Sequence, residues 1–130
     1  MKIKVIRPTL TSRHYFMNNL PPEEIHVWIL RWRSMTDWIK ENWGILNEEE
    51  IKQYTSYVKY EDMMRGAIGR IAVKKISSSY LGKEIKDIQI ERGRFGKPYL
   101  YCSENHLSIN YNLSHSGEIV RKRKILLRCP

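Results

Sequence analysis

Residues 61–80 read EDMMRGAIGRIAVKKISSSY, and this stretch decides the fold. Apolar side chains recur along it at the 3.6-residue period of an α-helix, which places on one arc Met64, Ile68, Ile71, Ala72, Ile76 and Tyr80. At 1.5 Å per residue such a helix is about 30 Å long, the width of a small domain. The pattern predicts one long helix that buries its apolar arc against the rest of the domain.

Arg65 lies within that apolar arc, near the amino end of the predicted helix. Its guanidinium must reach water, pair with a carboxylate or bind an anionic ligand, because leaving it buried and unpaired costs several kcal/mol. Gly66 and Gly69 each cost about 1 kcal/mol relative to alanine in a helix interior. Their presence indicates the close approach of another group. Two interpretations stay open here: a structural ion pair with tight helix packing, or a ligand.

Strands are expected on both sides of the helix. Residues 25–32 combine β-branched and aromatic side chains on two alternating faces, which predicts a strand that is partly covered on both sides. Residues 85–91 and 99–102 are typical of two further strands. Residues 107–114 alternate strictly between apolar and polar side chains. The whole pattern predicts an α+β fold in which a small, mostly antiparallel sheet packs on one long helix.

A small polar turn, Asn112-Leu-Ser-His-Ser-Gly117, closes the last of these strands. Its imidazole, hydroxyls and backbone donors can converge on a phosphate or carboxylate at the mouth of the sheet. Lys97 lies on the glycine-rich connection between two strands, and Pro98 stiffens the exit from that connection. A surface hairpin closed by polar residues is the alternative interpretation of the turn.

Composition narrows the class of protein. The chain of 130 residues fits one domain, and its two cysteines are too few for a disulfide framework or a zinc site, which favours a reduced, cytoplasmic setting. The first ten residues contain no long apolar run, so neither a signal peptide nor membrane binding is expected.

Residues 48–50 are three consecutive glutamates after Asn47, a pattern that predicts a helix capping box rather than a metal site.

Three segments are expected along the chain. Residues 1–22 end in two prolines and are interpreted as an extension, residues 23–120 as the domain, and residues 121–130 as a basic tail. The formal net charge is +9, and five of the positive residues lie among the last ten. Such a tail binds polyanions without specificity, so a non-enzymatic module that binds anions or nucleic acid is the alternative function.

Four segments occur in a characteristic order: Glu61-Asp-x-x-Arg65-Gly-x-x-Gly69-Arg70, Tyr80-Leu-Gly82, Gly96-Lys-Pro-Tyr-Leu100 and Asn112-Leu-Ser-His-Ser-Gly117. Together they resemble the amino-terminal half of the Sfp-type (surfactin-type) 4′-phosphopantetheinyl transferases, over about residues 24–120. Members of that family transfer phosphopantetheine from coenzyme A to a serine of an acyl or peptidyl carrier protein, using magnesium. They are pseudo-dimers of two similar α+β halves, with the ligand cleft between the halves.

The resemblance implies roles for individual residues. Lys97 and Pro98 match positions that contact coenzyme A, and Ser114 and His115 match a pair whose histidine contacts the 3′-phosphate. Arg65 matches a basic position near the same phosphate. A phosphate dianion would favour the protonated imidazole of His115. None of these residues is an obvious proton acceptor, so the resemblance assigns no catalytic residue.

The chain departs from the family after the polar turn. The family continues with a Gly-x-Asp-x-Glu segment and with a later Glu and Lys on a helix, whereas Val120 is followed here by RKRKILLRCP. Magnesium takes oxygen ligands, and this segment has no carboxylate. We therefore expect a truncated, frame-shifted or separately completed protein, inactive alone, that self-associates or joins a complementing second half. A Ser-His hydrolase is a third alternative that the sequence does not favour, because Ser114 and His115 are adjacent and no nucleophile elbow surrounds them.

Overall fold

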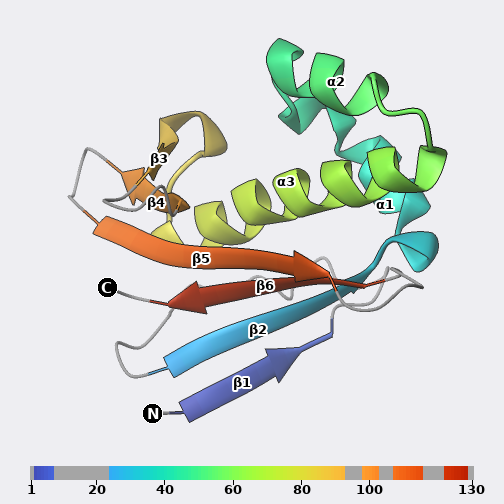
Figure 1. The fold of residues 1–130 in the computed structure, drawn as a ribbon. Coiled ribbons are helices and arrows are strands. Elements are labelled where there is room, and N and C mark those ends of the chain that lie inside the picture. The colour runs from blue at the N-terminus through green and yellow to red at the C-terminus, as the bar shows by residue number, and fades with distance from the viewer. Residues whose placement is uncertain (1, 8–23, 93–97, 103–106, 116–121, 129–130) are drawn as a thin grey trace.

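The computed structural model describes residues 2–7, 24–92, 98–102, 107–115 and 122–128. Its strands are β1 (Lys2–Ile6), β2 (Glu24–Arg31), β3 (Ile88–Arg92), β4 (Pro98–Cys102), β5 (Leu107–His115) and β6 (Lys122–Arg128). Its helices are α1 (Thr36–Glu41), α2 (Glu48–Thr55) and α3 (Tyr60–Leu81), with 3₁₀ turns η1 (Trp32–Ser34), η2 (Trp43–Ile45) and η3 (Ile85–Asp87). Figure 1 shows the three helices on one side of the sheet.

The strands form one sheet in the order β1-β2-β6-β5-β4-β3. The prediction of an α+β fold with one long helix on a sheet is confirmed. The sheet is larger than expected, with six strands. Its β2–β6, β6–β5, β5–β4 and β4–β3 pairs are antiparallel, and its β1–β2 pair is parallel. Parallel strands need a connection of a dozen or more residues, and 17 residues separate the end of β1 from the start of β2.

Helix α3 confirms the periodicity prediction to within one residue at each end. It stops at Gly82, whose φ of 63° lies in the left-handed region that glycine adopts without steric cost. The backbone N–H groups of Gly82 and Lys83 donate to the carbonyl oxygens of Ser79 and Ser78, so the helix end is satisfied. Within the described ranges, no helix is both long enough and apolar enough to cross a bilayer.

The core lies between α3 and the sheet. The apolar arc of α3 is buried, including Ile68, Ile71 and Ile76, and it packs over β5 and β6. Trp28 and Leu30 supply the β2 side of the same core. Burial of such side chains contributes about 1.5–3 kcal/mol each, which makes this layer the main source of stability.

A buried polar cluster crosses this core. His26 of β2 is 0% exposed, and its Nδ1 lies 2.5 Å from the hydroxyl of Tyr80 on α3. The same hydroxyl accepts a hydrogen bond of 3.2 Å from the indole N–H of Trp28. Nε2 of His26 lies 3.4 Å from the carboxylate of Glu24. The geometry fits a neutral imidazole that donates from Nε2 and accepts from Tyr80 at Nδ1.

Two predicted segment boundaries are wrong. Lys2–Ile6, interpreted as part of an extension, is the edge strand β1 and pairs with β2. Lys122–Arg128, interpreted as a basic tail, is the strand β6 and pairs on both sides, with β2 and β5. Backbone pairing from two neighbours satisfies the N–H and C=O groups of β6 whatever its charge. In the register with β2, residues 125, 126 and 127 pair with Trp28, Val27 and His26 respectively.

Candidate functional site

Strand pairing places the two strands that carry predicted site segments side by side. β4 begins at Pro98 and β5 ends at His115, and the two strands are antiparallel neighbours. Tyr99 pairs with Asn110, so Pro98 comes next to Tyr111, three residues before Ser114. Ser114 and His115 in turn pair with Lys124 and Arg123 of β6. Pro98 therefore lies beside the middle of β5, four residues before His115, while Lys97 lies outside the described residues.

Arg65 lies in the helix layer, near the end of α3 toward which β5 runs. It lies in the second turn of α3, and Figure 1 shows β5 running toward the end at which α3 begins. The Arg65 side chain is 20% exposed, and its guanidinium donates to the carboxylate of Asp62, one turn earlier. Of the two interpretations left open for Arg65, an ion pair is therefore present.

The close approach at Gly66 comes from an aromatic ring. A Cβ at Gly66 would lie 2.7 Å from ring carbons of Tyr54 on α2 and 3.4 Å from Tyr57. Tyr54 is itself buried in the core. Helix packing, rather than a ligand, thus explains this glycine.

Gly66→Ala is expected to lower the free energy of unfolding by about 1 kcal/mol, because overpacking costs about 1–3 kcal/mol while alanine returns about 1 kcal/mol of helix propensity. Gly44→Ala is the matched control, since its Cβ would meet nothing within 4 Å. Thermal unfolding followed by circular dichroism measures both variants. A Gly66→Ala protein as stable as Gly44→Ala would contradict the packing account.

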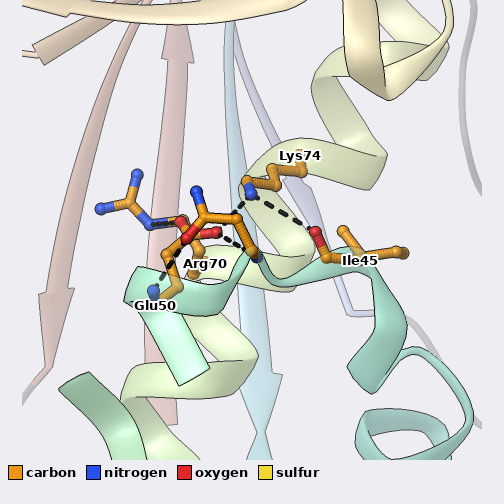
Figure 2. A network of polar contacts seen from close by, with 5 residues as sticks. Ile45, Glu50, Arg70 and Lys74 are labelled. Carbon is orange, nitrogen blue, oxygen red and sulfur yellow. Dashed lines mark hydrogen bonds and ion pairs between the residues drawn. The ribbon is translucent and has the colours of Figure 1, made fainter. Parts of the chain in front are cut away.

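A carboxylate joins α2 to α3 in a network that Figure 2 shows from close by. The Glu50 side chain is only 12% exposed, and its Oε2 lies 3.0 Å from Nε of Arg70 in an ion pair without hydrogen-bond alignment. Glu50 Oε1 accepts from the Asn47 backbone N–H at 3.0 Å and from Nζ of Lys74 at 2.5 Å. Lys74 also donates to the carbonyl oxygen of Ile45, at 3.4 Å.

The predicted capping box is confirmed by this network. The Asn47 side chain accepts from the Glu50 backbone N–H at 2.8 Å, and Glu50 reciprocates at the Asn47 backbone. The same carboxylate serves as a cap and as a counter-ion for two cations, a role that the sequence analysis did not identify. The available signal was the spacing of Arg70 and Lys74, which lie four residues apart and hence on one face of α3.

Arg70 is held at the junction of α2, α3 and β5. Burial alone would lower the pKa of Arg70, but a hydrogen bond with Tyr54 and the charges of Tyr54, Tyr111 and Glu50 outweigh it, and the pKa is raised. The guanidinium is therefore charged at every accessible pH and is committed to these neighbours. We assign Arg70 a structural role.

Metal ligands do not gather in the part of the chain that the structure describes. Within those residues, no three His, Cys, Asp or Glu side chains lie close enough to hold an ion. Glu50 is engaged by Arg70 and Lys74, while Glu48 and Glu49 are exposed on the first turn of α2. These carboxylates do not fit a magnesium site, which needs several oxygen ligands around one point.

Comparisons with known proteins agree with the fold and the motifs. The family model of the 4′-phosphopantetheinyl transferase amino-terminal region matches residues 30–122. No match was found among curated proteins. The fold is similar to that of Helicobacter pylori holo-[acyl-carrier-protein] synthase in complex with coenzyme A, with a TM-score of 0.53 and 15% sequence identity, covering 82% of this chain and 99% of the synthase. Because the matched region spans most of its length, the chain belongs to the 4′-phosphopantetheinyl transferase family and corresponds to its amino-terminal half.

Proposed function

We propose that this chain binds the nucleotide end of coenzyme A. The site comprises Arg65 from α3, Lys97 and Pro98 at the start of β4, and Ser114 and His115 at the end of β5. The observation that supports the proposal is the antiparallel pairing of β4 with β5, which makes the two strands that carry the family motifs neighbours, with β5 running toward the end at which α3 begins. A chain of this fold is compatible with coenzyme A, since the similar synthase was crystallised with it.

Positively charged donors would supply most of the proposed affinity for the phosphate of coenzyme A. The 3′-phosphate of coenzyme A is a dianion, and hydrogen bonds from charged donors contribute about 1.5–3 kcal/mol each. Arg65, whose guanidinium contacts Asp62, would supply a planar, charged donor group that suits a phosphate. A phosphate next to His115 would raise the pKa of its imidazole and hold it in the cationic form.

The family reaction would need groups beyond this site. It transfers phosphopantetheine to a serine of an acyl or peptidyl carrier protein with the aid of magnesium, and Arg65, Lys97 and His115 are cations that neither bind the metal nor accept a proton. We propose that a complementing second half, in another chain or another copy, supplies the acidic residues. On this proposal the isolated chain captures coenzyme A without completing the transfer.

The alternative function, polyanion binding by a basic tail, loses its main support. Lys122–Arg128 lies inside the sheet between β2 and β5, so the segment is not a free tail. Deleting residues 121–130 would remove a central strand and is therefore unsuitable as a test of either function.

Calorimetric titration of the whole chain with coenzyme A, with and without magnesium, tests the proposal. We expect weak binding that depends little on magnesium, because the phosphate contacts come from protein cations. A carrier-loading assay with the same protein should show no product. Failure to bind coenzyme A in either buffer would refute the proposed site, and robust loading by the isolated chain would refute the need for a second half.

A further inference from the structure

The connection between α2 and α3 presents an apolar surface that the proposed coenzyme A site does not use. We define the 57–60 tip as Tyr57, Val58, Lys59 and Tyr60. Val58 is fully exposed, Tyr60 is 53% exposed and Tyr57 is 40% exposed. Exposed apolar side chains scattered singly are ordinary, whereas three within four positions form a patch of the kind that contacts a partner.

The 57–60 tip is held in place on both sides by aromatic contacts. The ring of Tyr57 packs edge-on against buried Tyr54, with centroids 5.9 Å apart, and the ring of Tyr60 packs edge-on against buried Trp32, with centroids 6.1 Å apart. Backbone hydrogen bonds from the N–H of Tyr57 to Tyr54 and from Ser56 to Lys52 continue the turn. The two anchors leave Val58 standing outward between them.

Charges around the 57–60 tip favour an acidic partner. Glu61 lies 3.9 Å from Arg33, and Asp62 is paired with Arg65, so the nearest carboxylates are already compensated. Lys59 is exposed and forms no ion pair with any described residue. The chain as a whole has a formal net charge of +9, which adds long-range attraction for an acidic surface.

The 57–60 tip also lies beside the proposed coenzyme A site. Tyr57 approaches the position of Gly66, the neighbour of Arg65 in α3. A macromolecule that rests on the tip would therefore stand at the end of the domain where the nucleotide is proposed to bind.

We propose that the 57–60 tip is the docking surface for the carrier protein, with Val58 entering an apolar notch and Lys59 meeting an acidic rim. This inference rests on the proposed function, which supplies the carrier protein as acceptor. A membrane or a second copy of the chain could also cover an apolar tip, and the experiment separates these occupants.

Binding is measured by fluorescence anisotropy with the whole chain and two labelled probes, an apo-acyl carrier protein and an apo-peptidyl carrier domain. Val58→Ser is expected to weaken binding of at least one probe about tenfold, the cost of losing one buried aliphatic side chain. Lys59→Glu should weaken it as well, and more at low salt than at high salt. The matched control is Val5→Ser on edge strand β1, where the valine is 48% exposed, and it should bind as the parent does.

Three outcomes would overturn the docking surface: neither probe binds the parent, Val58→Ser binds as tightly as the parent, or Val5→Ser weakens binding equally. If Val58→Ser loses binding to anionic vesicles but binds the carrier probes as the parent does, the docking surface is also overturned and the tip is assigned to a membrane. A Val58→Ser protein that is more monomeric than the parent, with unchanged carrier binding, would overturn it in favour of a second copy. Coenzyme A titration of the parent reports separately on the proposed function.

Discussion

Glu50→Ala is expected to lower the free energy of unfolding by about 2–3 kcal/mol, a large fraction of the stability of a small domain. Removing one partner of a fully buried ion pair costs about 3–5 kcal/mol, and the 17–28% exposure of Lys74 and Arg70 reduces that cost through solvent screening. The loss of half the capping box adds to the effect, since a helix cap contributes about 1 kcal/mol.

Two further variants, Glu49→Ala and Glu50→Gln, serve as comparisons for Glu50→Ala. Glu49→Ala removes an exposed glutamate from the same helical turn and should change stability by less than about 0.5 kcal/mol. Glu50→Gln keeps an oxygen acceptor for Asn47 and Lys74 but removes the charge, so it should fall between the two. Urea unfolding followed by tryptophan fluorescence measures all three. An equal loss for Glu50→Ala and Glu49→Ala would contradict the role given to this carboxylate.

Acid is expected to unfold the domain through His26. Burial lowers the pKa of this imidazole below 6.5, with Lys4 acting in the same direction and Glu24 opposing it. On acidification the unfolded chain therefore takes up its proton first, and the free energy of unfolding falls as the pH drops below about 6.5 until the folded pKa is reached. Each unit of lowered pKa contributes about 1.4 kcal/mol.

The hydrogen bonds explain why protonation is costly there. A cationic imidazole would donate from Nδ1 to the Tyr80 hydroxyl, which already accepts from Trp28, and the hydroxyl proton would lose its acceptor. Burial also raises the pKa of Tyr80 to about 12, although the hydrogen bond from Trp28 opposes that rise. The unfolded chain thus loses this proton first above pH 10, and the domain should weaken at high pH as well.

Denaturant unfolding of the parent and of His26→Gln at a series of pH values from 8 to 5 measures the acid effect. The parent should lose stability across this range, and the variant should show a smaller slope. Nuclear magnetic resonance titration of the His26 ring in the parent gives the folded pKa directly and needs no variant. A folded pKa at or above 6.5 would contradict the account.

Local patterns in the sequence predicted the elements that local physics determines. The apolar arc of 61–80 located α3, Asn47 and Glu50 located the start of α2, and alternation located β2 and β5. β6 was missed because its first three residues, Lys122–Lys124, are all basic, and only pairing with β2 and β5 makes that segment a strand. β1 was missed because its five residues are too few to show a clear alternation of apolar and polar side chains. Its partner, β2, begins 18 residues after β1 ends.

Only part of the candidate site could be predicted from the sequence. The motif order indicated Lys97, Pro98, Ser114 and His115, and the β4–β5 pairing makes the strands that carry Pro98 and the Ser-His pair neighbours, with Pro98 beside the middle of β5. Arg65 was identified as a cation needing a partner, but spacing alone could not distinguish Asp62 from a ligand. The Glu50 network and the His26–Tyr80 contact join residues 20 to 54 positions apart, which no local pattern reveals.

The central claim is that the proposed cations, Arg65, Lys97 and His115, hold the 3′-phosphate of coenzyme A. Calorimetric titration of the parent and of His115→Ala with coenzyme A and with 3′-dephospho-coenzyme A tests it most directly. The account predicts that the parent prefers coenzyme A by about tenfold or more, and that His115→Ala loses most of this preference while binding the dephospho form unchanged. Equal affinity of the parent for the two ligands, or an undiminished preference in His115→Ala, would contradict it.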